Sequence, residues 1–310
     1  MIREKYIHGL LYAVLSSATF GLIPLFSIPL LAGGMSSQTV LCYRFLFAAL
    51  MMGVIVVLAR RNLKLDFKQL CVVVLLSILY ALTAILLIES YKSIPSGIAT
   101  TIHFLYPLAV TLIMSWFFGE KSAISTYIAI VVSLVGVTLL AWGGHHGADF
   151  KQGVALAMGT VVTYALYIVG VMKSRASSID PLTLTFYVLL IGAIMFFIYA
   201  IATSGIDPLH SFVQWRDLIL VALVCTVLSD YTLVLAIKHI GSTMTSILGS
   251  MEPMTAVVVG VVYFGERFDV ASIVGVLLVI IAVVIVIVQG GRDSAEIESG
   301  DINKDEDGVS

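Results

Sequence analysis

The chain has 310 residues, of which 60% are hydrophobic and only 12% are charged, and its mean hydropathy is +1.07. Soluble domains carry about 25% charged residues, so this composition excludes a water-soluble globular protein and predicts a chain that lies in a lipid bilayer. The formal net charge of −2 hides an acidic tail, residues 292–310, which holds seven acidic and two basic residues. We expect this tail to be disordered and solvated.

Ten apolar runs follow one another along the chain, each near the ~20 residues that a helix needs to cross the hydrocarbon core. They lie at 7–31, 38–59, 69–90, 95–117, 123–142, 152–172, 181–203, 217–237, 242–264 and 270–289. Polar segments at 60–64 and 89–95 mark the breaks where the gaps between runs are short. The sequence therefore predicts an all-α integral membrane protein with ten transmembrane helices.

The basic residues predict how the chain is oriented. If the N-terminus is cytoplasmic, twelve bases fall on the cytoplasmic side and four, Lys92, Lys151, Arg216 and Arg267, fall outside. Short cytoplasmic loops carry an excess of Lys and Arg, so this arrangement is favoured over its reverse. We expect both termini to be cytoplasmic.

Two stretches of the chain match each other without a gap at an offset of 146 residues. Between 92–121 and 238–267, seven of thirty positions are identical. The identical pairs are Lys92/Lys238, Ile94/Ile240, Ser96/Ser242, Pro107/Pro253, Phe118/Phe264, Gly119/Gly265 and Glu120/Glu266. The front parts of the two copies also match, at an offset of 144, so the chain is expected to be a duplication.

Each copy contains five of the predicted helices, and five is an odd number. The second copy must then enter the membrane from the opposite side, which makes the two copies inverted repeats. We expect the first repeat at 1–150, the second at 151–291 and the tail at 292–310. Inverted repeats recur among secondary transporters, which bind substrate near the midplane between the two copies and work by alternating access.

The duplicated ten-helix layout resembles the drug/metabolite transporter superfamily and, within it, the EamA family. The motifs that carry the resemblance are Phe20-Gly21-x-x-Pro24, Tyr43-Arg44-Phe45, Tyr106-Pro107 with Phe118-Gly119-Glu120-Lys121, and Glu252-Pro253 with Phe264-Gly265-Glu266-Arg267 and Gly275. The resemblance covers about residues 7–290 and implies a bacterial inner-membrane exporter of amino acids or related small metabolites. The second copy departs from the first at Val188, which occupies the position of Arg44.

The resemblance does not name a substrate, so several functions stay open. Within transport, the alternatives are a nucleobase, sugar or drug carrier, or an uncoupled facilitator. From another class, they are a membrane scaffold or a lipid-modifying enzyme. We expect a small-molecule substrate and the lipid bilayer as partners and no nucleic acid, and we leave proton coupling and the oligomeric state open.

The predicted helix at 95–117 carries a narrow polar stripe, which includes Thr100, His103 and Pro107. At 100° per residue these positions fall on one side of the helix. A polar side chain at membrane depth is costly unless it faces a cavity or a partner helix. His103 is expected either to line the substrate pathway or to donate a hydrogen bond between helices. Thr100 is the weaker candidate, because small residues also serve close helix packing.

Glu252 lies about halfway along the predicted helix at 242–264, beside Pro253 and six residues after Ser246. A carboxyl group at this depth is either neutral, paired with a base or exchanging protons. Glu252 is therefore expected to bind a substrate ammonium or to carry a coupling proton, and the structural alternative is a partner for Arg44 or a backbone N–H. The repeat places Tyr106 opposite Glu252, and Ser246 is a further candidate for substrate contact.

Two more ionisable residues lie within predicted helices, Asp230 in 217–237 and Arg44 in 38–59. Asp230 is a candidate gate or proton relay, or else a polar residue that faces a cavity. Arg44 lies close to the external end of its helix, where snorkelling to the interface is expected rather than contact with a substrate carboxylate. Tyr164 is a candidate for stacking on substrate, although filling of the core is the simpler role.

The features common to both copies are expected to serve the architecture. Pro107 and Pro253 lie mid-segment, while Glu120 and Glu266 end their helices and shape the turn that follows. The sequence carries no enzyme motif, so we expect neither catalysis nor a cofactor. Its three cysteines lie in apolar runs without metal-type spacing, and no metal site is expected.

Overall fold

The computed structural model describes residues 2–119, 148–203 and 205–266, together with 124, 128, 131–132, 135–136, 139, 270–271, 273–278, 280–282 and 285. These residues form helices and their connections and contain no β-strand. In chain order the elements are α1 (Ile2–Phe20), α2 (Ile23–Ala32), α3 (Ser37–Leu58), α4 (Phe67–Ser90), α5 (Ser96–His103), α6 (Tyr106–Phe118), α8 (Ala148–Lys173), η1 (Arg175–Ser178), α9 (Pro181–Ala202), α10 (Phe212–Ala222), η2 (Leu223–Leu228), α11 (Ser229–Ile247), η3 (Leu248–Ser250) and α12 (Met251–Phe264).

Seven helical segments of the described chain are long and apolar enough to cross a membrane, by length and composition. They are Tyr6–Ala32, Ser37–Leu58, Phe67–Ser90, Ser96–Phe118, Asp149–Lys173, Pro181–Ala202 and Phe212–Ser242. Two shorter apolar helices, Met251–Phe264 and Ile273–Ala282, fall within the ninth and tenth predicted spans. The fifth predicted span, 123–142, lies largely outside the described residues. The protein is therefore an all-helical, multi-pass membrane protein, and the total of ten helices stays a prediction.

Several helices begin at residues whose side chains accept hydrogen bonds from free backbone N–H groups. Asp66 and Gln69 form a capping box at the start of α4, and Ser211 and Gln214 form one at the start of α10. In a capping box, both side chains accept hydrogen bonds from backbone N–H groups that have no partner within the first helical turn. Asp180 caps α9 directly before Pro181. Local sequence therefore determines where these spans begin.

Three spans that the sequence predicts as continuous helices are interrupted. The first breaks between α1 and α2 at 21–22, and the fourth breaks between α5 and α6 at 104–105. The ninth passes through the short 3-10 turn η3 before α12. Pro24 and Pro107 lie in the first positions of the helix after each break, and Pro253 lies in the first turn of α12. Proline cannot donate the interior hydrogen bond but is tolerated at a helix start, so each helix restarts there.

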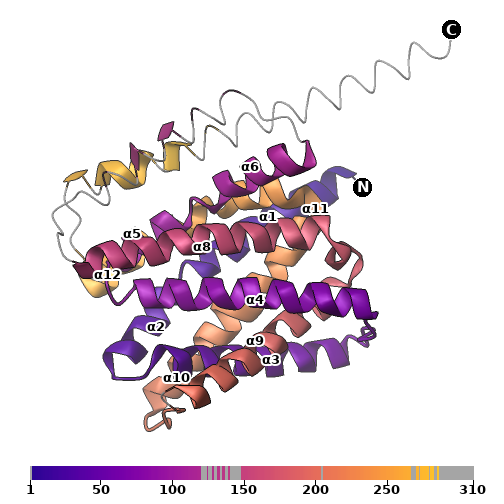
Figure 1. Ribbon diagram of the computed structural model, residues 1–310, viewed down its shortest axis with the longest axis horizontal. Helices are drawn as coiled ribbons and strands as arrows, with labels where there is room; N and C mark the ends of the chain where they lie inside the picture. Colours follow the sequence, from indigo (N-terminus) through magenta and orange to yellow (C-terminus); the bar gives the residue numbers. More distant parts are fainter. Residues whose placement is uncertain are drawn as a thin grey trace.

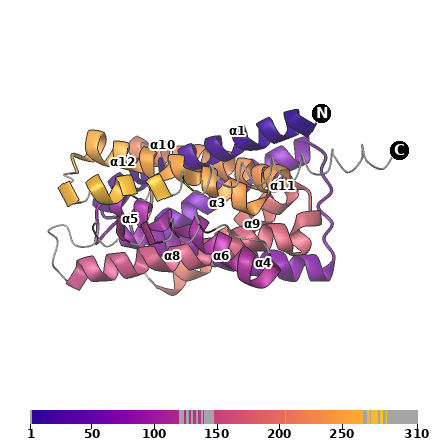
Figure 2. The same cartoon turned by 90° about the horizontal axis from the view of Figure 1, so that it is seen from above.

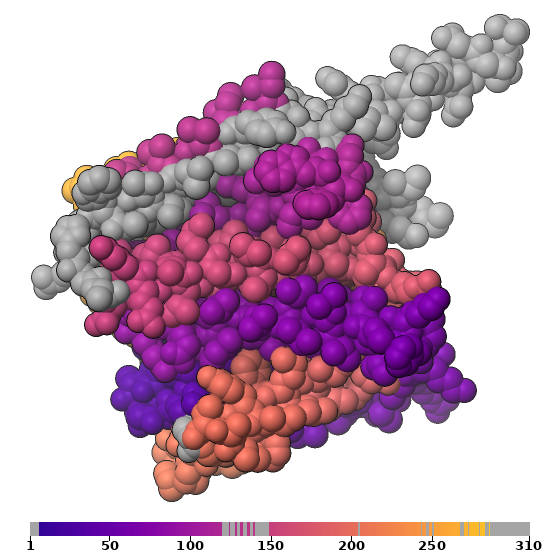
Figure 3. All heavy atoms as spheres, in the orientation of Figure 1, coloured from indigo at the N-terminus to yellow at the C-terminus, as the bar shows by residue number. Residues whose placement is uncertain are grey.

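The helices lie side by side along the long axis of the molecule (Figure 1). Helix α3 packs along α9, α1 along α11 and α4 along α8. Seen from above, α1, α11 and α12 lie on one side of the bundle and α4, α6 and α8 on the other (Figure 2). Figure 3 shows α4 and α8 next to each other on the surface. Segments that are far apart in the sequence thus build one bundle.

The connecting segments meet at the two ends of the bundle. At one end the Arg61 guanidinium lies 3.7 Å from the Asp180 carboxylate, and the Tyr187 hydroxyl donates to the carbonyl of Leu63 over 2.7 Å. At the other end the Ser36 hydroxyl donates to Asp207 over 2.8 Å. The connection after α3 therefore lies beside the one before α9, and the connection before α3 lies beside the one after α9.

Candidate functional site

The three helix breaks lie next to one another in the interior. Phe20 ends α1, His103 ends α5 and Glu252 is the second residue of α12. His103 is fully buried, and Glu252 is 1% exposed. A Cβ atom at Gly21 would lie 2.5 Å from the backbone oxygen of Glu252, so only glycine permits this approach of α1 to α12. The sequence thus brings an imidazole and a carboxyl group together where the helices are interrupted.

The ring of His103 is fixed by Thr160 of α8. The distance between His103 Nδ1 and Thr160 Oγ1 is 2.7 Å, and the Thr160 hydroxyl also donates to the carbonyl of Ala157. A hydroxyl has one hydrogen to donate, so the network assigns the donor role in the first bond to His103 Nδ1. In neutral His103 the other ring nitrogen, Nε2, is then an acceptor.

His103 Nε2 faces the carboxyl group of Glu252 at 3.6 Å from Oε1. Both atoms are buried and neither has a hydrogen-bond partner among the described residues. Two acceptors at this distance repel each other unless a proton resides on one of them or a donor from a ligand lies between them. The pair can therefore hold one proton or contact a cationic group.

Aromatic rings surround this pair. The centroid of the His103 ring lies 5.0 Å from that of Tyr164, 5.3 Å from that of Tyr106 and 6.0 Å from that of Phe20. Tyr106 and Tyr164 meet edge to face at 4.7 Å. The structure thus brings four of the predicted substrate-contacting residues together, His103, Tyr106, Tyr164 and Glu252.

The remaining two predicted contact residues are Thr100 and Ser246. Thr100 is buried on α5, with its hydroxyl 3.3 Å from that of Tyr91. The side chain of Ser246 lies outside the described residues. At Gly249 of η3, the hydroxyl of Tyr106 takes up the space that a side chain would need.

A second buried polar centre lies around Asp230 of α11. The Tyr80 hydroxyl donates to Asp230 Oδ1 over 2.6 Å, while Asp230 Oδ2 has no partner among the described residues. Asp230 is 2% exposed. A single donor thus reaches a carboxyl group that could accept several.

Arg44 also lies in this interior region, which corrects the expectation that it snorkels to the interface. Arg44 is 3% exposed, and its Nε donates to Thr226 Oγ1 over 2.7 Å. Its position on α3 faces η2 rather than lipid, so the long side chain has no path to the interface. Arg44 is not the partner of Glu252 either, because the ionisable group that faces Glu252 is His103.

The segment that holds Arg44 has a wider helical turn that the sequence did not predict. Residues Leu223–Leu228 (η2) form a π-helix between α10 and α11. The Thr226 hydroxyl donates to the carbonyl of Val221, five residues earlier, over 2.9 Å. Single π-helical turns inside α-helices are rare and are often found at functional sites. Single-sequence patterns of hydrophobicity do not distinguish such a turn from an ordinary one.

Tyrosine rings connect the two centres. Tyr80, the partner of Asp230, lies 5.1 Å from Tyr167 between ring centroids, and Tyr167 stacks on Tyr164 at 6.0 Å. The Tyr164 ring in turn contacts His103. All three tyrosines are at most 3% exposed. An unbroken aromatic path therefore runs from the carboxyl group of Asp230 to that of Glu252.

Glu266 follows the end of α12 and contacts the start of α5, in the first half of the chain. Its Oε1 atom accepts hydrogen bonds from the backbone and the hydroxyl of Ser96, and its Oε2 atom accepts one from the backbone of Gly97. The sequence predicts that Glu266 shapes its own turn, and the structure places its carboxylate at the start of α5. Glu120, its counterpart in the first copy, lies outside the described residues.

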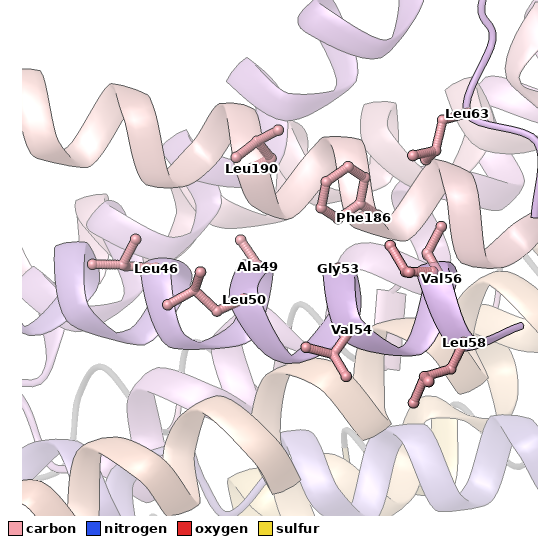
Figure 4. Close-up of a pocket in the computed structure, with 11 residues that line it drawn as sticks. Leu46, Ala49, Leu50, Gly53, Val54, Val56, Leu58, Leu63, Phe186 and Leu190 are labelled. Atoms are coloured by element: carbon pink, nitrogen blue, oxygen red, sulfur yellow. The ribbon is translucent and has the colours of Figure 1, made fainter. Parts of the chain in front are cut away.

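An apolar groove of about 500 Å³ lies on the outer side of α3 and α9. Figure 4 shows Leu50, Gly53 and Phe186 among the residues that line it. All the lining residues are apolar, so the groove offers a polar solute no hydrogen-bond partner from a side chain. We therefore place the candidate site at the buried polar centres and not here.

The described residues contain no group of three or more His, Cys, Asp or Glu that could hold a metal ion. The three cysteines are free thiols, of which Cys42 and Cys225 are buried and Cys71 is exposed.

Comparison with protein families identifies two matching regions. A model described as the EamA-like transporter family matches residues 7–142 and 151–288. Each match covers one of the two predicted repeats, and together they span nearly everything outside the acidic tail.

Individual relatives are distant. The uncharacterized transporter YvbV of Bacillus subtilis is 25% identical over 75% of this chain and 77% of its own length. The threonine/homoserine exporter RhtA of Salmonella typhimurium is 26% identical over 62% of this chain and 63% of its own length, so the match spans less than two thirds of that exporter. A solved crystal structure shares the fold, with a TM-score of 0.69 and 14% identity over 92% of this chain and 98% of that chain.

Proposed function

Because the chain belongs to the EamA-like transporter family of the drug/metabolite transporter superfamily, we propose that it exports amino acids or related small metabolites by alternating access. Transport follows from the family, whereas the substrate class and the direction are the proposal. The similarity to a threonine/homoserine exporter supports small, polar, zwitterionic solutes as the substrate class. We place the protein in the bacterial cytoplasmic membrane with both termini on the cytoplasmic side.

The observation that carries the proposal is the buried pair of His103 and Glu252. Ionisable groups inside a membrane bundle are costly and mark substrate or ion pathways. His103 Nε2 lies 3.6 Å from Glu252 Oε1, and neither atom has a hydrogen-bond partner among the described residues. Three helix breaks lie beside the pair. Interrupted helices of this kind build the midplane sites of secondary transporters. We assign Glu252 the coupling proton and His103, Tyr106 and Tyr164 the wall of the substrate pathway.

The pairing of helices supports two inverted halves at 1–150 and 151–291. If the first copy runs from α1 to the fifth span, then α8 is the counterpart of α1 and α11 that of α4. Replacing each helix by its counterpart then turns the observed pair of α1 and α11 into the observed pair of α8 and α4. The pair of α3 and α9 consists of two counterparts, so the same replacement leaves it unchanged. Rocking one half against the other would open the buried pair to each side in turn.

Thr100, Ser246, Asp230 and Arg44 are secondary members of the proposed pathway. We propose that Asp230 and Arg44 act in coupling or gating, since both are ionisable and buried, and since tyrosine rings lead from Asp230 towards Glu252. Pro107, Pro253, Glu120 and Glu266 serve the architecture around the breaks. The partners are a small-molecule substrate, the lipid bilayer and protons.

A growth screen tests the substrate class. Cells that overproduce the protein are challenged with toxic concentrations of threonine, homoserine and other amino acids, and in parallel with nucleobases, sugars and drugs. The proposal predicts resistance to amino acids that is lost in the Glu252→Gln variant. Resistance confined to nucleobases, sugars or drugs would contradict the proposed substrate class and leave the family assignment intact.

A further inference from the structure

Asp230 keeps an unfilled hydrogen-bonding site in the interior. Tyr80 donates to Oδ1, but Oδ2 is buried and has no donor among the described residues. A buried carboxylate is stable when charged groups or several donors surround it. One oxygen of Asp230 is thus available to a cationic donor from outside the chain.

Arg44 keeps unfilled donors in the same region. Its guanidinium has five N–H groups, and the bond from Nε to Thr226 uses one of them. Within the part of the chain that the structure describes, the other four have no acceptor. Thr226 itself is held by its bond to Val221 across the π-helical turn, so the guanidinium has a fixed position.

Arg44 is hydrogen-bonded to Thr226, four residues before Asp230 in the chain, yet the two ionisable groups form no ion pair with each other among the described residues. A buried arginine and carboxylate with a purely structural role are expected to close into a direct, two-bonded pair, because separation leaves both charges poorly compensated. Instead, Asp230 keeps an unused acceptor atom and Arg44 keeps unused N–H donors, and a group of opposite charge could bind to each of them.

Neither charge belongs to the duplicated architecture. Arg44 comes from the first copy, and Val188 takes its place in the second. Asp230 comes from the second copy, and at the offset of 146 its counterpart in the first is Ala84. The centre therefore combines one unmatched charge from each half, which sets it apart from the shared prolines and glutamates.

We propose that Arg44 and Asp230 together bind the charged head group of a zwitterionic amino acid, an inference that rests on the proposed transport of such solutes. The guanidinium of Arg44 holds the carboxylate through paired hydrogen bonds, and Oδ2 of Asp230 accepts from the ammonium group. The substrate side chain lies along the path of Tyr80, Tyr167 and Tyr164. Both side chains are buried in this conformation, as they would be in an occluded state between openings to either side.

Binding of three related probes to the purified full-length protein tests the charge requirement. The probes are threonine, threonine amide, which lacks the carboxylate, and N-acetylthreonine, which lacks the ammonium. Each removed charge costs a charge-assisted hydrogen bond, so we expect wild-type affinity to fall by about tenfold or more for either analogue. Equal affinity for all three probes, or binding of none, would overturn the inference.

Variants assign each charge to its residue. Arg44→Gln is expected to bind threonine and its amide equally, and Asp230→Asn to bind threonine and N-acetylthreonine equally. Arg44→Lys keeps the charge but cannot form the paired hydrogen bonds, so it should retain a reduced preference for threonine over threonine amide. This variant tests the assignment of Arg44 if Arg44→Gln does not fold. The matched controls Arg175→Gln and Asp149→Asn change exposed residues and should behave as the wild type. A wild-type preference in Arg44→Gln would contradict the assignment of Arg44.

Flux measured in parallel separates this inference from the proposed function. If threonine binds with the expected charge requirement but is not transported in proteoliposomes, the exporter proposal fails and the binding site stands. If threonine is transported but the analogues bind equally well, the head-group site fails and the exporter proposal stands.

Discussion

Glu266 caps helix α5 from the other half of the chain: its Oε1 atom accepts from the backbone N–H of Ser96 over 2.8 Å and from the Ser96 hydroxyl over 2.6 Å. Its Oε2 atom accepts from the backbone N–H of Gly97 over 3.3 Å. A carboxylate at a helix N-terminus satisfies free donors and complements the helix dipole. One side chain thus joins the end of α12 to the start of the helix that carries His103.

Removal of this cap should destabilise the protein. We expect Glu266→Ala to lower the free energy of unfolding by about 1–2 kcal/mol, the usual range for loss of a helix N-cap. The measurement is denaturant or thermal unfolding in detergent. Glu89→Ala is the matched control, because Glu89 forms only a partly exposed pair with Lys92, worth about 0–1 kcal/mol. Equal effects of the two substitutions would argue against the cap.

Gly260 lies directly beneath the carboxylate of Glu266, where an added Cβ atom would collide with Oε2. Replacing glycine by alanine within a helix ordinarily stabilises it by up to ~1 kcal/mol. Here we expect Gly260→Ala to destabilise the protein, because the carboxylate must leave α5. In the Glu266→Ala background the same substitution should become neutral or stabilising. Additive effects in this double-mutant cycle would contradict the contact.

Asp207 gives the connection after α9 a pH dependence. Hydrogen bonds from the backbone and hydroxyl of Ser36 hold the pKa of Asp207 below its usual value of 3.8. A depressed pKa contributes stability that is present above the unfolded value and is lost as the pH falls through the folded one. We expect Asp207→Asn to cost stability near neutral pH and to flatten the loss of stability below pH ~4. A variant whose unfolding midpoint follows the wild-type pH profile would contradict this contribution. Asp149→Asn, at an exposed helix start, is the control.

Single cysteines at repeat-equivalent positions test the inverted topology. Cys71 is exposed and is replaced by serine first, while Cys42 and Cys225 are buried. Lys92→Cys should react with a membrane-impermeant reagent in intact cells, and Lys238→Cys only after permeabilisation. Labelling of both from the same side would contradict the inverted repeat.

Much of the fold could be predicted from the sequence, because hydrophobic run length is a direct physical requirement of the bilayer. Seven predicted spans appear as long apolar helices within a few residues of their expected bounds. The helix breaks were missed because a proline near the middle of an apolar run signals either a kink or a restart, and only packing decides which.

Site residues could be predicted where their depth in the membrane is enough to identify them. They could not be predicted where their position depends on which side chains they contact. His103 and Glu252 were selected because each is ionisable and central to its span, but nothing in the sequence says that they face each other. Snorkelling of Arg44 was wrong because the residue lies near a helix end but on the buried face. The sequence gives one indication of the hydrogen bond between Ser96 and Glu266, because each of these residues is identical to its counterpart in the other copy.

The central claim is that Glu252 carries a proton during transport, and flux of threonine into proteoliposomes tests it most directly. With wild-type protein, an acidic interior should accelerate uptake by proton exchange. Glu252→Gln cannot exchange a proton, so its uptake should fall about tenfold or more, equivalent to ~1.4 kcal/mol of barrier, and should not respond to the gradient. Uptake by Glu252→Gln at the wild-type rate, with no effect of the gradient on either protein, would contradict the account.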